Sequence, residues 1–113
     1  MTDRLPAHLE ASSLIRRAQQ EGGFATVIAR GDRDSGALVL LIASRGIHAA
    51  CLERQLGSGG GYAWQRVGPA AGVADSDVQQ WAKNRRKFDP DCWLIELDVP
   101  STERFIAETT SIG

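Results

Sequence analysis

The stretch ALVLLIAS, residues 37–44, constrains the fold of this chain more than any other feature. It is apolar at odd and even positions alike, and only its last residue, Ser44, is polar. A strand of this kind is buried on both faces, whereas a half-solvated strand alternates apolar and polar residues. Since a membrane span needs about 20 apolar residues, the run is too short to cross a bilayer. We therefore expect a central strand whose two faces are covered by helices or by a partner.

Four more segments have the composition of strands. The first strand ends at the turn cluster GDRDSG, and the fourth strand is reached through the glycine-rich connection GSGGG. The last one, CWLIELDV, alternates cleanly, with Trp93, Ile95, Leu97 and Val99 on one side. The lengths of the first four strands fit an antiparallel meander. The four segments besides residues 37–44 are residues 24–30, 48–56, 62–67 and 92–99.

Helical spacing of apolar residues predicts three helices. The first covers residues 6–21, with Pro6 at its start and Gly22-Gly23 as its stop. Its predicted buried face comprises Ala7, Ala11, Leu14, Ile15 and Ala18.

The second predicted helix covers residues 75–88, and Ser76 and Gln79 have the spacing of a capping box. Its predicted buried face comprises Val78, Trp81, Ala82 and Phe88. A third helix follows Ser101, which can cap it, and carries Phe105 and Ile106.

The resulting order, α-β-β-β-β-α-β-α, predicts an α+β fold with a mainly antiparallel five-stranded sheet and three helices. Its 113 residues are the size of one domain, so we expect residues 1–113 to form a single domain. A hydrophobic fraction of 42% and a charged fraction of 24% are those of a globular protein. The net charge of −1 provides no overall field to attract nucleic acid or an anionic membrane.

The N-terminal residues have no continuous apolar segment of the kind that secretory signals contain. The two cysteines, Cys51 and Cys92, lack the spacing of a CxxC motif and are predicted to be reduced and buried. These features predict a soluble, cytoplasmic protein. No cofactor and no metal is predicted: the two histidines, His8 and His48, and the two cysteines could make a zinc site only if the fold gathered them.

The motif FDPDCW, residues 88–93, allows two interpretations. Asp89 precedes a proline and so should end the helix, while Asp91 can accept backbone hydrogen bonds in an Asx-type turn. The alternative is an enzyme site in which the two carboxylates act as acid and base beside the Cys92 thiol. We favour the turn, because each residue has a structural task.

Two glycine-containing loops resemble ligand sites but depart from the motifs. GDRDSG, residues 31–36, lacks the glycine and glutamate that a calcium-binding EF-hand loop requires, and a hairpin turn is favoured. GSGGG, residues 57–61, has Tyr62 where the dinucleotide fingerprint needs its last glycine. Neither loop predicts a bound ion or nucleotide.

The sequence KNRRK, residues 83–87, is the strongest local charge signal. Cations at a helix C-terminus complement the helix dipole, which is the simpler interpretation. The alternative is a binding patch for a phosphate backbone or an acidic partner. That patch would consist of Lys83, Arg85, Arg86, Lys87 and Trp81.

Several segments together resemble a small bacterial family known as domain of unknown function 1491. They are residues 9–32, GALVLLI, ERQLG with YAWQRV, and residues 88–108. The likeness covers nearly the whole chain, and the first and last segments are the most specific. It implies a stand-alone cytoplasmic bacterial domain, but it carries over no activity and no catalytic residue.

We expect a non-enzymatic interaction or adaptor protein with an unknown protein partner. Two strands are apolar on both sides, so one sheet face could meet a partner, and self-association as a homodimer is predicted. In the strand at 24–30, Ala25, Val27 and Ala29 oppose Phe24, Thr26 and Ile28. The alternatives are weak nucleic-acid binding through residues 83–87, which the net charge disfavours, and an enzyme site near residues 89–92.

Overall fold

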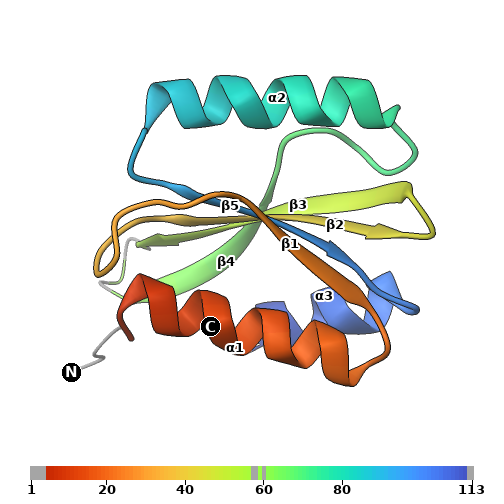
Figure 1. The fold of residues 1–113 in the computed structure, drawn as a ribbon, viewed down its shortest axis with the longest axis horizontal. Coiled ribbons are helices and arrows are strands. Elements are labelled where there is room, and N and C mark those ends of the chain that lie inside the picture. Colours follow the sequence, from red (N-terminus) through yellow and green to blue (C-terminus); the bar gives the residue numbers. More distant parts are fainter. Residues whose placement is uncertain (1–4, 57–58, 60, 112–113) are drawn as a thin grey trace.

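The computed structural model describes residues 5–56, 59 and 61–111, and shows a sheet between two layers of helices (Figure 1). One helix covers one face of the sheet, and the other two helices cover the opposite face. The elements are α1 (Ala7–Gln20), β1 (Phe24–Ala29), β2 (Leu38–Ser44), β3 (Ile47–Leu56), β4 (Tyr62–Val67), α2 (Asp75–Phe88), β5 (Trp93–Asp98) and α3 (Thr102–Ser111). The predicted α+β class, element order and three helices are confirmed. None of the helices in the described part of the chain has the length and apolarity to cross a membrane.

The sheet has the strand order β1-β5-β2-β3-β4. Strand β2 is parallel to β5, and all other neighbouring pairs are antiparallel. The predicted meander is therefore wrong at one point, because β5 lies between β1 and β2. The composition of β5 explains its interior place: Leu94 and Ile95 are both buried although they point to opposite faces, and only an interior strand has both faces covered in this way.

Two apolar clusters hold the layers together. The larger cluster lies between the sheet and helices α1 and α3, and it contains Leu40, Ile95 and Phe105. The smaller cluster lies under α2, which buries only Val78 and Ala82 fully. As predicted, β2 is covered on both sides, since Leu40 belongs to the first cluster and its neighbours Val39 and Leu41 to the second.

Two predicted details of α2 are wrong. The helix is preceded by Ala74, and no side chain caps it, so Ser76 and Gln79 do not form a capping box. Phe88 is 92% exposed instead of buried. It follows Val78 by ten residues, and at 3.6 residues per turn this places it about 80° from the direction in which Val78 points.

The loop GDRDSG is a turn, but it is not a hairpin, because β1 and β2 do not pair. The Asp32 carboxylate accepts hydrogen bonds from the Asp34 and Ser35 backbone N–H groups and from the Ser35 hydroxyl. These contacts lower the pKa of Asp32, led by the backbone hydrogen bond from Ser35. The GSGGG loop lies largely outside the described residues.

Candidate interaction site

A groove of about 630 Å³ runs between α2 and the edge strand β1. Aliphatic side chains and a proline form its floor, and basic side chains form the wall on the α2 side. We call it the β1 groove. Its lining residues are Ile28, Ala29, Lys83, Arg86, Lys87, Pro90 and Leu94.

The groove exists because α2 does not cover β1. Ala25 and Val27 pack against the cluster under α1, so the alternating residues Phe24 and Thr26 lie on the α2 face. A β-bulge between Val27 and Ala29 then places Ile28 beside the groove. Phe24 is 76% exposed and Ile28 is 41% exposed. An apolar strip is thus left open along the edge of the sheet.

The outer edge of β1 is also unpaired. Among the described strands β1 pairs with β5 alone, and it is the first strand in the sheet order. An edge strand presents backbone N–H and C=O groups to which another extended chain can bind. The bulge at Ile28 limits the regular part of this edge to its first four residues.

The basic wall contains one fixed and two free cations. Arg86 donates from Nε to the Pro90 carbonyl and from Nη2 to the Arg30 carbonyl, both at 2.9 Å, so it ties the end of α2 to the end of β1. Lys83 and Lys87 are exposed. Within the described residues, neither ammonium has a hydrogen bond or an ion pair.

The other two members of the predicted basic patch lie on the opposite side of α2. The Arg85 Nε donates a 2.8 Å hydrogen bond to Glu53 on β3, and this bond is the main cause that raises the pKa of Arg85. The Trp81 ring packs so closely against Gly68 that a Cβ there would lie 2.7 Å from it. The structure therefore brings together Lys83, Arg86 and Lys87, but it separates Arg85 and Trp81 from them.

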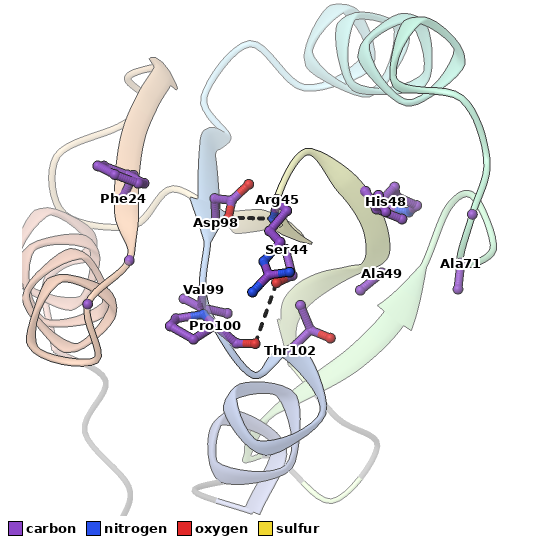
Figure 2. Close-up of a pocket in the computed structure, with 14 residues that line it drawn as sticks. Phe24, Ser44, Arg45, His48, Ala49, Ala71, Asp98, Val99, Pro100 and Thr102 are labelled. Carbon is purple, nitrogen blue, oxygen red and sulfur yellow. Dashed lines mark hydrogen bonds between the residues drawn. The ribbon is translucent and has the colours of Figure 1, made fainter.

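A second hollow, of about 860 Å³, lies at the end of the sheet where β1 begins (Figure 2). Figure 2 shows Phe24 and His48 on opposite sides of it. The Asp98 carboxylate beside it accepts the backbone N–H groups of Arg45 and Gly46, both at 2.9 Å, and so holds the β2–β3 turn. This carboxylate therefore has its partners in the turn, and β1 contributes the Phe24 side chain to the hollow.

A family model described as "Protein of unknown function (DUF1491)" matches residues 5–107 of the chain. The chain belongs to the DUF1491 family. This confirms the resemblance inferred from the sequence. No curated protein gives a significant match to the chain.

Solved structures of DUF1491-like proteins show the same fold. A crystal structure of a DUF1491 family protein from Caulobacter crescentus is 25% identical, with a TM-score of 0.78, and the alignment covers 90% of this chain and 94% of that one. An NMR structure of a DUF1491 family protein from the same species is 24% identical with a TM-score of 0.78, covering 92% and 94% of the two chains. A solution structure of an A. tumefaciens protein is 24% identical with a TM-score of 0.74, covering 91% and 92%.

The motif FDPDCW forms a turn between α2 and β5. The Asp89 carboxylate accepts the Asp91 backbone N–H at 3.2 Å, and the Asp89 carbonyl accepts the Cys92 N–H at 3.0 Å. The Asx-type contact is thus made by Asp89, not by Asp91 as the sequence suggested. Asp91 contributes its backbone carbonyl, which accepts the Asp32 N–H at 2.8 Å.

The two thiols have the properties of core residues. Cys51 and Cys92 are fully buried, and burial raises the pKa of Cys51 to about 12 and is the largest cause that raises the pKa of Cys92. A reactive thiol is partly exposed and has a lowered pKa, which is the opposite combination. His48 contacts the Pro69 carbonyl through Nε2 at 3.0 Å. No group of three or more His, Cys, Asp or Glu suited to a metal occurs in the part of the chain that the structure describes.

Phe24 and Ile28 are residues of the open strip that the sequence analysis did not assign to a site. The only signal was the alternation within residues 24–30, where the larger side chains fall on one side. The sequence cannot show which side of that strand lacks a helix. That depends on β5 lying between β1 and β2, which sets β1 at the edge.

Proposed function

We propose that this DUF1491 chain is a non-enzymatic interaction domain that binds another polypeptide along β1. The observation that carries the proposal is the combination of a free strand edge with the apolar, basic-walled β1 groove beside it. Strand addition to a sheet edge is a recurring mode of peptide recognition, in which backbone hydrogen bonds give affinity and the adjacent pocket gives specificity.

The contacts of residues 89–92, where the alternative enzyme site would lie, favour this proposal over catalysis. Asp89 contacts the Asp91 N–H and lies 3.8 Å from Arg85, and the Cys92 thiol is buried with a raised pKa. A catalytic pair needs a reactive group that substrate can reach. In this turn, the observed contacts each have a structural role.

Nucleic-acid binding through residues 83–87 has less support. Arg85 is paired with Glu53, and Trp81 packs against Gly68 and is not placed for base stacking beside the lysines. Arg17 on α1 does not add a free cation, because it donates to the Phe105 carbonyl and to the Thr109 hydroxyl. Within the described residues, the basic helix end at 83–87 leaves only Lys83 and Lys87 unpaired, which is a small electrostatic footprint for a phosphate backbone.

Self-association is the homotypic form of the same proposal. The broad apolar face that motivated it is covered by α2, so the surface left for a second copy is β1. Antiparallel pairing of two β1 strands about Ala25 stays within the regular part of the edge and would set Phe24 of each copy opposite Thr26 of the other. Such aromatic–β-branched cross-strand pairs each contribute about 0.2–1 kcal/mol.

Site-specific photocrosslinking in bacterial cells tests the proposal. A benzophenone amino acid replaces Thr26, which is exposed on β1, and in the matched control it replaces Gln65, which is exposed on the opposite edge strand β4. We expect a discrete adduct from position 26 and none from position 65. An adduct of twice the chain's mass identifies a second copy. No adduct from position 26, or the same adducts from both positions, would contradict the proposal.

A further inference from the structure

The charges around β1 indicate what kind of polypeptide fits there. On the α2 face, Lys83 and Lys87 flank the β1 groove, and neither pairs with an acidic residue in the part of the chain that the structure describes. On the opposite face, the exposed residues Arg30 and Arg33 line a cavity of about 280 Å³ between α1 and β1. No acidic residue lines either hollow. The free edge of β1 is thus bordered by cations on both faces.

We infer that the occupant of β1 is an extended, acidic and apolar segment of another protein, which adds to the sheet as a strand. This inference rests on the proposed function and gives the chemistry of the partner. An added strand sends alternate side chains to the two faces of the sheet. Those on the α2 face would lie beside Phe24 and Ile28, and long acidic side chains among them would extend towards Lys83 and Lys87.

A second copy fits these charges less well. Its β1, with the sequence FATVIA, contains no carboxylate. Homotypic pairing of β1 would bring no carboxylate to Lys83 and Lys87, whereas an acidic strand would. A single-stranded nucleic acid carries the required charge, but it has no peptide backbone to pair with the edge of β1.

The apolar strip gives the inference a second, independent support. Phe24 and Ile28 are large apolar side chains held in solvent at the two ends of β1. A partner that binds through charge alone would gain no binding free energy from burying these two side chains. A segment with both apolar and acidic residues uses the floor and the wall of the groove together.

The test measures binding of fluorescent eight-residue peptides to the intact chain by anisotropy. One peptide repeats Val-Val-Glu-Glu, so that as a strand it presents both residue types on each face. A second has lysine in place of glutamate. Two more keep the acidic sequence and carry N-methyl groups on either the odd or the even backbone nitrogens, so that one of the two blocks the hydrogen bonds to the edge of β1 while the side chains stay unchanged. We expect the acidic peptide to bind, the basic one to fail, and methylation in at least one of the two alternate registers to weaken binding roughly tenfold or more.

Two protein variants with the same net charge change complete the test. K83E/K87E reverses the free cations of the groove, and R66E/R104E reverses two exposed cations on β4 and α3. We expect the first variant to lose roughly tenfold in affinity for the acidic peptide and the second to change by less than about twofold. Circular dichroism confirms that both variants are folded.

Four results would overturn the inference. The first three are equal binding of the acidic and basic peptides, full affinity of both N-methylated peptides, and unchanged affinity of K83E/K87E. The fourth is tighter binding of a single-stranded oligonucleotide at the same site. If no peptide binds while photocrosslinking from position 26 succeeds, the acidic-strand inference fails and the proposed interaction function stands.

Discussion

Glu53 and Arg85 illustrate how a contact distant in sequence changes the role of a residue. The Glu53 side chain is buried in the sheet and pairs with Arg85 on α2 at 2.8 Å. From the sequence, Arg85 was one of four cations at a helix end, and nothing local distinguished it from Lys83 or Lys87. Its partner lies 32 residues earlier, so its structural role depends on the tertiary fold and could not be predicted.

Replacing Arg85 should destabilise the protein because the buried Glu53 carboxylate would lose its cationic partner and, among the described residues, keep only the hydrogen bond from Gln55. We expect Arg85→Met to lower the free energy of unfolding by about 2 kcal/mol, since removing one member of a buried pair is strongly unfavourable and Arg85 is partly solvated. Lys87→Met, a matched change at an exposed cation, should alter it by less than about 0.5 kcal/mol. Urea unfolding of the two variants measures the difference, and equal effects would contradict the assigned role.

Gly31 should tolerate substitution less well than Gly46. A Cβ at Gly31 would collide with the Asp91 carbonyl oxygen, whereas Gly46 has a φ of +78° and open space around its Cβ position. We expect Gly31→Ala to cost about 3 kcal/mol through steric overlap and Gly46→Ala about 1 kcal/mol through backbone strain alone. Thermal unfolding monitored by circular dichroism provides the comparison. A larger loss in Gly46→Ala would be inconsistent with this packing.

The buried thiol of Cys51 should make the stability of the protein depend on pH in alkaline solution. Cys51 has a folded pKa of about 12 against an ordinary value of 9.0. A raised pKa means that the folded state holds the thiol proton more tightly than the unfolded state does. The resulting contribution to the free energy of unfolding is complete below pH 9 and is lost as the pH rises towards 12. We expect the stability of the wild type to fall relative to Cys51→Ser between pH 9 and 11. A constant difference in melting temperature across that range would show that Cys51 does not titrate as described.

At the scale of elements, β5 shows what a sequence pattern can predict and what it cannot. Its alternation was predicted correctly, with Trp93, Ile95 and Leu97 facing the larger core cluster. Its position between β1 and β2 was not predicted, because the parallel pairing of β5 with β2 joins segments that are more than 50 residues apart in the sequence. Periodicity shows which side chains are buried, but it does not identify the neighbouring strands. The open edge of β1 follows from that unpredicted pairing.

The apolar side chains of β1 should matter little for folding. Phe24 is 76% exposed, whereas Phe105 on α3 is fully buried. We expect Phe24→Ser to change the free energy of unfolding by less than about 0.5 kcal/mol, and Phe105→Ala to lower it by about 4 kcal/mol. Chemical denaturation tests both. If Phe24→Ser were as damaging as Phe105→Ala, Phe24 would be a core residue and not part of a binding surface.

At the scale of the whole molecule, the net charge does not reveal the group of cations that the fold gathers around β1. The net charge of −1 correctly gives no strong overall field. The exposed cations near β1 nevertheless come from two distant segments, with Arg30 and Arg33 in one and Lys83 and Lys87 in the other. They border the same strand only after folding, so composition and local motifs could predict the basic helix end but not the groove.

Amide hydrogen exchange along β1, measured by NMR with and without the acidic peptide, tests the central claim most directly. In the isolated protein, the β1 amides that do not bond to β5 should exchange rapidly, because the outer edge of β1 is open to water. The acidic peptide should slow those amides and leave the β4 amides unchanged. Protection of every β1 amide in the protein alone, or no change when the peptide is added, would contradict the claim that β1 is an open docking edge for an acidic strand.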